Sequence, residues 1–125
     1  MKNVVLGITA FVLIGCQSNK LEQGRWDGSL TPMNHPEMDN PLTYDVSYND
    51  DELTIDIAGP DSTVMRTRNP RIKNDTLHFS FEEPEEQVLL TCKMGGNGNN
   101  TYAGRCTDKS GKWAYFTMRY TGSGS

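Results

Sequence analysis

The chain has 125 residues, and its 16 acidic residues outnumber its 12 basic ones, which gives a formal net charge of −4. This length suits a single domain with one modest hydrophobic core. A mildly acidic chain without a basic stripe is poorly suited to nucleic acid, whose phosphates it would repel, and to electrostatic docking on anionic lipid. We therefore expect one small domain that binds no nucleic acid.

The chain begins with one basic residue, Lys2, followed by a mostly apolar run over residues 4–14. This run has the length of the apolar region of a signal peptide and is too short for a membrane-spanning helix, which needs about twenty apolar residues. A buried core helix is the alternative, but the run passes directly into a polar stretch and shows no amphipathic stripe. The N-terminus is therefore expected to direct export.

The apolar run ends in the sequence LIGC at residues 13–16. This motif resembles the lipobox of bacterial lipoproteins. The resemblance implies that residues 1–15 are removed as a signal peptide and that Cys16 carries a lipid anchor at the start of a tether, residues 16–23. Gln17 follows the cysteine in place of an aspartate, and by the same resemblance this favours the outer membrane of a cell envelope.

From residue 24 onward, apolar and polar residues alternate with the two-residue period of half-buried strands, and no window has the period of a helix. Clusters of Gly, Pro, Asn and Asp mark the turns, and Asn69-Pro70 is expected to end one strand. The expected strands are residues 24–33, 42–48, 53–57, 62–68, 76–81, 88–92, 102–106 and 113–120.

About eight short antiparallel strands in series predict an all-β domain over residues 24–120. An up-and-down barrel is favoured because closure removes the exposed edges of the sheet, and a small β-sandwich is the alternative. Residues 121–125 are rich in Gly and Ser and are expected to form a flexible tail.

With Cys16 lipidated, two cysteines remain, Cys92 and Cys106, on either side of a Gly/Asn-rich segment. Export places them in an oxidising compartment, where a disulfide is the default state. If two strands fold back about Asn99, the two cysteines lie opposite each other, at a separation that suits a bridge. Two free buried thiols are the alternative.

The first strand contains the sequence GRWDG at residues 24–28, and the last strand contains Arg119. These features resemble the Gly-x-Trp start and the terminal arginine of lipocalin-like, calycin-type barrels. The resemblance implies that Arg119 packs across Trp26 and closes one end of the barrel, a cation–π contact worth about 0.5–2 kcal/mol. The apolar face of the last strand includes Phe116, so a bulge would be needed to turn Arg119 inward.

Aromatic residues occupy alternating positions of several expected strands, where they can line a cavity. An ordinary packed core is the more frequent use of such residues, and both uses remain open. The candidate ligand pocket consists of Tyr44, Tyr48, Phe79, Phe81, Tyr102 and Phe116.

The sequence contains no recognisable catalytic motif, and we expect neither an enzyme nor a bound cofactor. His35 and His78 lie far apart without neighbouring ligands, so no metal site is expected. Acidic clusters at residues 50–52 and 82–86 are interpreted as solvated turns.

Two functions are consistent with these features. By resemblance to lipocalins, the domain binds a small apolar or amphipathic ligand while its anchor holds it at the membrane. The alternative is a protein-interaction lipoprotein, such as an inhibitor of a basic extracellular enzyme. This resembles the small lipoproteins that block lysozyme, and here the acidic turns would steer the partner.

Overall fold

The computed structural model describes residues 20–61, 63–84 and 86–122, so the predicted signal sequence and Cys16 lie outside the described residues. No helix in this described part is long and apolar enough to cross a membrane. The structure is all-β. Its strands are β1 (Gly24–Pro32), β2 (Asn40–Asn49), β3 (Glu52–Ala58), β4 (Val64–Arg66), β5 (Arg68–Lys73), β6 (Thr76–Glu83), β7 (Val88–Gly96), β8 (Thr101–Thr107) and β9 (Trp113–Gly122).

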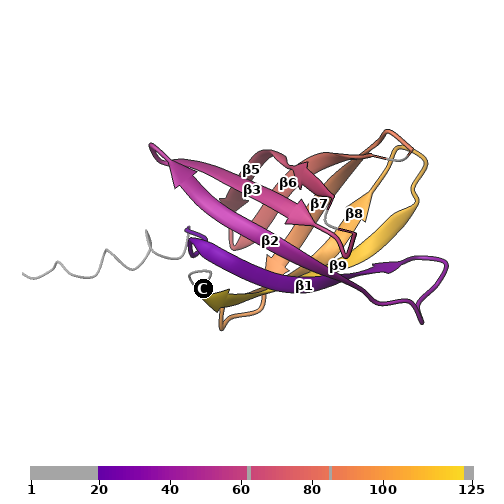
Figure 1. The fold of residues 1–125 in the computed structure, drawn as a ribbon, viewed down its shortest axis with the longest axis horizontal. Coiled ribbons are helices and arrows are strands. Elements are labelled where there is room, and N and C mark those ends of the chain that lie inside the picture. Colours follow the sequence, from indigo (N-terminus) through magenta and orange to yellow (C-terminus); the bar gives the residue numbers. More distant parts are fainter. Residues whose placement is uncertain (1–19, 62, 85, 123–125) are drawn as a thin grey trace, which may run out of the picture.

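The nine strands form one antiparallel sheet in the order β4-β3-β2-β1-β9-β8-β7-β6-β5. The first long strand, β1, pairs with the last, β9, and all other neighbours are consecutive in the chain. The two strands at the edges of the sheet, β4 and β5, are also consecutive and are separated only by Thr67. The sheet therefore closes on itself as a barrel (Figure 1), and the sandwich alternative is wrong.

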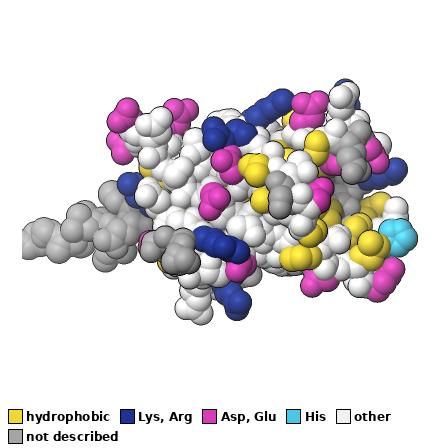
Figure 2. All heavy atoms as spheres, in the orientation of Figure 1, with side chains coloured by type: hydrophobic (Ala, Val, Ile, Leu, Met, Phe, Trp, Pro, Cys, Tyr) yellow, Lys and Arg dark blue, Asp and Glu magenta, His cyan; other side chains and the backbone are white. Residues whose placement is uncertain are grey.

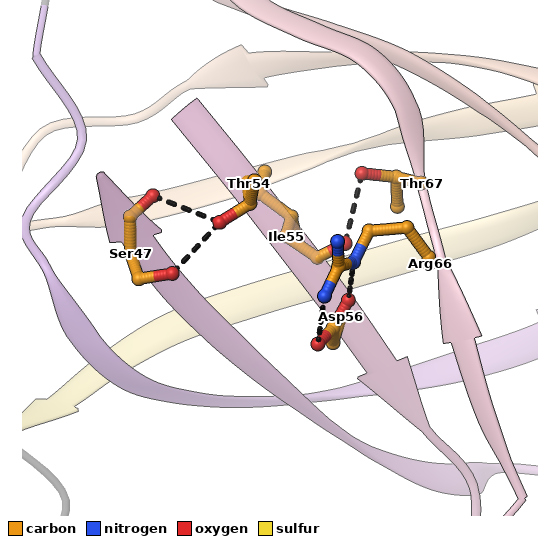
Figure 3. A network of polar contacts seen from close by, with 6 residues as sticks. All are labelled: Ser47, Thr54, Ile55, Asp56, Arg66 and Thr67. Carbon is orange, nitrogen blue, oxygen red and sulfur yellow. Dashed lines mark hydrogen bonds and ion pairs between the residues drawn. The ribbon is translucent and has the colours of Figure 1, made fainter. Parts of the chain in front are cut away.

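Closure depends on the short segment in which the chain changes partner. β4 pairs with β3, whereas β5 pairs with β6. At the junction, both the amide and the hydroxyl of Thr67 donate hydrogen bonds to the carbonyl oxygen of Ile55, at 3.0 and 2.9 Å. On the same strands, Arg66 pairs with Asp56 (Figure 3). β4 and β5 thus act as two halves of one bent strand, which reconciles nine strands with the eight predicted.

β5 continues to Lys73 because the expected break at Asn69-Pro70 is absent. Asn69 has a φ of 52°, and the register of β5 on β6 shifts between Arg68 and Arg71. Asparagine tolerates this left-handed conformation, and proline, which lacks an N–H, is accepted where the ladder is interrupted. The chain therefore bulges at these two residues and continues as β5.

The barrel has two different ends. One, called the closed end here, carries Lys20, Gly122 and the turns after β2, β5 and β7; in Figure 1 the described part of the chain begins and ends on this side. The other, called the open end, carries the loops after β1, β3, β6 and β8. The turns at 50–51 and 74–75 have positive φ at both central residues, as tight hairpins require.

Inward-facing side chains from every long strand fill the barrel from the closed end to its middle. Trp26, Tyr44, Ile55 and Leu77 are fully buried. The predicted disulfide is confirmed, because Cys92 and Cys106 lie directly opposite each other on β7 and β8 and are bonded inside the barrel. Two-residue alternation thus specifies the core.

The closed end is sealed by Trp26, but Arg119 takes no part, so that implication of the resemblance is wrong. Arg119 of β9 lies opposite Asp27 of β1 on the outer face and is exposed. Trp26 instead contacts the rings of Tyr120 and Tyr102, with centroids 5.4 and 5.9 Å away. A register shift is present, but it lies between Arg25 and Trp26 on β1 and leaves Arg119 outside.

Part of the expected tether is packed against this end. Leu21 is buried, and its amide and carbonyl both bond the hydroxyl of Tyr48, at 2.9 and 2.8 Å. The indole N–H of Trp26 donates to the carbonyl of Glu22 at 2.9 Å, and Tyr120 donates to that of Gln23. The barrel therefore begins before β1, and residues 21–23 belong to it as well as to the expected tether.

Two inward-facing glycines allow neighbouring strands to approach closely. A Cβ at Gly28 would lie 1.7 Å from the carbonyl oxygen of Thr117, and one at Gly104 would lie 1.9 Å from that of Lys93. Such glycines let a small barrel bend sharply enough to close.

Candidate functional site

A cavity of about 600 Å³ lies at the open end of the barrel. Its volume is within the range of small-molecule sites. Figure 2 shows most of the visible hydrophobic side chains on the same half of the molecule as this end. The apolar lining consists of Leu30, Leu42, Met65, Phe81, Leu90 and Phe116, with Pro60 and Pro84 in the adjoining loops.

Two phenylalanines form the most deeply buried part of the wall. Phe81 of β6 and Phe116 of β9 meet edge to face, with ring centroids 6.0 Å apart, and both are almost fully buried. Phe79 continues the ring cluster toward the closed end, 6.3 Å from Phe81. The ring contacts that form this wall are thus made within the barrel itself.

The polar lining lies where the strands meet the loops. It consists of Asn40, Asp61, Thr63 and Glu83, and no Lys, Arg or His is among the described residues that line the cavity. The Asp61 carboxylate accepts a hydrogen bond from the amide of Thr63 at 3.1 Å, and that of Glu83 accepts one from the amide of Glu86. The lining is therefore an apolar cup with acidic groups at its rim.

The open end is hollow in part because the last inward position of three strands is small or polar. Asn40 of β2, Ala114 of β9 and Glu83 of β6 occupy these positions, which at the other end are held by residues such as Trp26 and Tyr102. An eight-stranded barrel is just wide enough for large side chains to fill it. Without them, space for one small ligand remains.

The structure divides the six predicted pocket residues into three groups. Phe81 and Phe116 line the cavity. Tyr44 and Phe79 belong to the packed middle, where burial raises the pKa of Tyr44 and its hydroxyl donates to the carbonyl of Thr117 at 3.0 Å. The other two, Tyr48 and Tyr102, lie at the closed end.

Sequence reasoning missed four aliphatic lining residues: Leu30, Leu42, Met65 and Leu90. All are on the inward face that the alternation predicts, but alternation does not say which end of a strand meets a hollow. The useful signal was a small or polar residue in inward register at, or just beyond, the same end of several expected strands.

The two histidines are separated in the fold as well as in the sequence. His35 lies in the loop before β2, beside Glu37, and His78 lies on the outer face of β6. Within the described residues, no three His, Cys, Asp or Glu side chains are arranged to hold a metal ion.

Comparison with known proteins defines the fold class. No protein-family model and no curated protein matches the chain. Among solved structures it resembles a redesigned β-barrel, b11L5F_LGL, with a TM-score of 0.63 and 12% identity, covering 80% of this chain and 91% of that one.

Two further similar structures are redesigned β-barrels bound to DFHBI. mFAP1 has a TM-score of 0.59 and 13% identity and covers 78% of this chain and 94% of its own. mFAP0 has a TM-score of 0.59 and 14% identity and covers 81% of this chain and 100% of its own. At these identities the likeness shows the fold alone, a small antiparallel β-barrel.

Proposed function

We propose that the protein is a lipid-anchored protein of the cell envelope that holds a small amphipathic molecule in the open end of its barrel, without catalysing a reaction. The observation that carries the binding role is the 600 Å³ cavity with apolar walls and a polar rim. Two similar barrels of known structure hold a small molecule, DFHBI, which supports the capacity of such barrels for a ligand.

The lining favours one class of ligand. An apolar portion would displace water from Leu42, Met65 and Leu90, at about 25 cal/mol for each Å² of apolar surface buried. The polar portion would lie beside the carboxylates of Asp61 and Glu83. A neutral donor or an amine is complementary to these groups, whereas an anionic head group would be repelled.

The place of the N-terminus is consistent with an anchor. Lys20 lies four residues after Cys16 and at the closed end, so a lipid on Cys16 would leave the cavity mouth unobstructed. A single acyl chain holds a protein only marginally at a membrane, whereas two or three chains hold it firmly. Intact mass of the exported protein, with Cys16→Ala as the control, tests this: wild type should carry diacylglyceryl mass and partition into the membrane fraction.

The binding role is tested on a chain beginning at Gln17, which keeps all the described contacts of the barrel. Native mass spectrometry after periplasmic secretion should show an adduct that is lost on denaturation. Leu90→Trp fills the cavity and should abolish the adduct. Leu89→Trp is the matched control, because Leu89 is 44% exposed and its side chain points outward, so the adduct should persist.

Ligand class is tested by calorimetry with an alkyl amine, alcohol and carboxylate of equal chain length. The amine and alcohol should bind and the carboxylate should bind least. Equal binding of all three, unaffected by Leu90→Trp, would show that the cavity is not the site.

The acidic rim also favours a second candidate, a cationic protein partner. The open-end loops carry the acidic residues Glu37, Asp39, Asp61, Glu86 and Asp108. The basic residues Lys109 and Lys112 lie in the same loops and partly offset this negative charge. A basic enzyme such as lysozyme would then bind in a strongly salt-dependent way, and Leu90→Trp would leave this binding unchanged. The two acidic clusters of the sequence cannot form one surface, because residues 50–52 lie at the closed end.

A further inference from the structure

The fold aligns basic residues that are far apart in the sequence. Arg71 lies opposite His78, His78 opposite Lys93, and Lys93 opposite Arg105, on the adjacent strands β5 to β8. Arg71, Lys93 and Arg105 are exposed on the outer face, and His78 is half-buried. These four residues are called the basic row, and they overturn the expectation that the surface has no basic stripe.

The basic row differs from three other arginines of the described barrel in its ion pairing. Arg25, Arg66 and Arg68 each form an ion pair with a carboxylate elsewhere on the barrel. Among the described residues, no carboxylate pairs with a member of the basic row. The neighbouring outward positions on the same four strands hold threonine, serine, lysine or small residues. Like charges directly opposite each other destabilise a sheet, so this arrangement carries a cost in the isolated protein.

His78 reports the positive potential at this surface. Partial burial lowers its pKa, and so do the positive charges of Arg71, Lys93 and Lys73. Arg71 and Lys73 face His78 from β5, and Lys93 faces it from β7. An anionic partner would relieve this repulsion.

Hydroxyl and aromatic groups extend the surface. A shallow groove of about 440 Å³ lies between Lys93 and Arg105 and is also lined by Thr91 and Thr107, which can donate hydrogen bonds to oxyanions. The Arg105 guanidinium lies 4.3 Å from the ring centroid of Trp113. Tyr115, opposite Arg105 on β9, is 42% exposed. Trp and Tyr beside basic residues are typical of the membrane–water interface.

We propose that the basic row docks the barrel on the anionic phospholipid head groups of the membrane. The choice of a membrane as the anionic partner rests on the proposed anchor at Cys16. Four residues span at most about 14 Å, so such an anchor would keep the closed end next to the bilayer. Arg71, His78 and Lys93 all lie in the half of their strands nearer that end.

Docking is measured by cosedimentation of the chain beginning at Gln17, which lacks the anchored cysteine, with lipid vesicles. Binding to phosphatidylcholine vesicles containing phosphatidylglycerol should exceed binding to pure phosphatidylcholine and should fall with added salt. Each basic residue near an anionic membrane contributes a factor of about five to partitioning. Lys93→Glu with Arg105→Glu should therefore lower the partition coefficient by at least about 25-fold.

The matched control is Lys109→Glu with Lys112→Glu, which changes the net charge equally at two exposed positions in the loop after β8, at the open end and outside the basic row. It should weaken binding much less than the double reversal in the row. An equal loss of vesicle binding in the two double variants would show that net charge alone acts and would overturn the proposal. Equal binding of the wild type to anionic and to pure phosphatidylcholine vesicles would also overturn it. Displacement from vesicles by inorganic phosphate at matched ionic strength would indicate a free-phosphate site and would likewise overturn it.

A measurement on the wild-type residues guards against misfolding of the reversed variant. Nuclear magnetic resonance titration of the His78 ring should show its pKa rising when anionic vesicles are added, because their negative potential favours the protonated imidazole. An unchanged His78 titration in the bound state would place the contact elsewhere. The result is independent of lipidation, because this chain carries no Cys16.

Discussion

The two ends of this barrel follow the same alternating pattern and yet differ in what they hold. At the closed end, Trp26 is fully buried between aromatic rings, and its N–H bonds the backbone of Glu22. At the open end, inward positions such as Asn40 and Ala114 are small or polar, and a cavity remains. The size of a few terminal inward residues, not the strand pattern, therefore decides whether such a barrel is packed or hollow.

The largest expected effect comes from truncating the closed end. Trp26→Ala should lower the free energy of unfolding by about 3–5 kcal/mol, because it removes a large buried ring and leaves a cavity. Leu30→Ala at the open end should cost only about 1–2 kcal/mol, because Leu30 is partly exposed and already borders a cavity. Denaturant unfolding of both variants checks this, and equal losses would mean that the ends are packed alike.

Removing the disulfide should have the next largest effect. Cys92 and Cys106 are 14 residues apart in sequence, and opening a loop of about this size costs about 3 kcal/mol in the chain-entropy model. Cys92→Ala with Cys106→Ala should therefore lower the unfolding midpoint in guanidinium chloride without abolishing the ring contact between Phe81 and Phe116. The mass of the wild type, measured under non-reducing conditions, is the control that the bridge has formed. A loss of unfolding free energy well below about 1 kcal/mol would contradict the prediction.

The close approach of β1 to β9 is tested at the inward-facing Gly28. Gly28→Ala would place a methyl group against the Thr117 carbonyl, and the backbone shift should cost about 1–3 kcal/mol or more. Gly95→Ala is the matched control, because a Cβ there meets nothing within 4 Å. Thermal unfolding should separate the two, and a harmless Gly28→Ala would show that β1 and β9 can move apart freely.

The smallest effect concerns an open-end loop. The hydroxyl of Ser110 and the amides of Lys112 and Ser110 hold the pKa of Asp108 below its usual range. A lowered pKa in the folded state stabilises the protein at a pH above the unfolded value of about 3.9, and this contribution disappears as the pH falls through the folded pKa. Asp108→Asn should therefore be less stable than wild type at neutral pH but not in strong acid.

Urea unfolding of wild type and Asp108→Asn, at neutral pH and in strong acid, tests this prediction. Ser110→Ala removes the hydroxyl donor but keeps the amide. Its stability at neutral pH should therefore lie between that of wild type and that of Asp108→Asn. A difference between wild type and Asp108→Asn that grows in acid would contradict the assignment.

Much of the fold was predictable because it depends on local pattern. Alternation in β2 and β6 identified inward residues such as Tyr44 and Phe79, and the spacing of Cys92 and Cys106 predicted their bridge. The bend at Asn69-Pro70 was missed, because a bulge leaves the same local signature as a strand break.

The site was less predictable because it depends on which side chains share one end of the barrel. Phe81 and Phe116 were predicted from alternation, but Met65 and Leu90 meet them only through closure. The role implied for Arg119 failed for a related reason: a one-residue difference in register decides between the inner and outer face, and here Tyr120 faces Trp26.

The all-β domain, its strands and core face, and the pairing of its cysteines could all be predicted from the chain, because two-residue alternation and turn residues act over short distances. The proposed anchor depends on the lipobox-like residues 13–16, which are also read from the chain. The hollow end and the row of Arg71, His78, Lys93 and Arg105 could be seen in the folded barrel alone. Both features arise from the register between strands, which closure of the whole barrel sets.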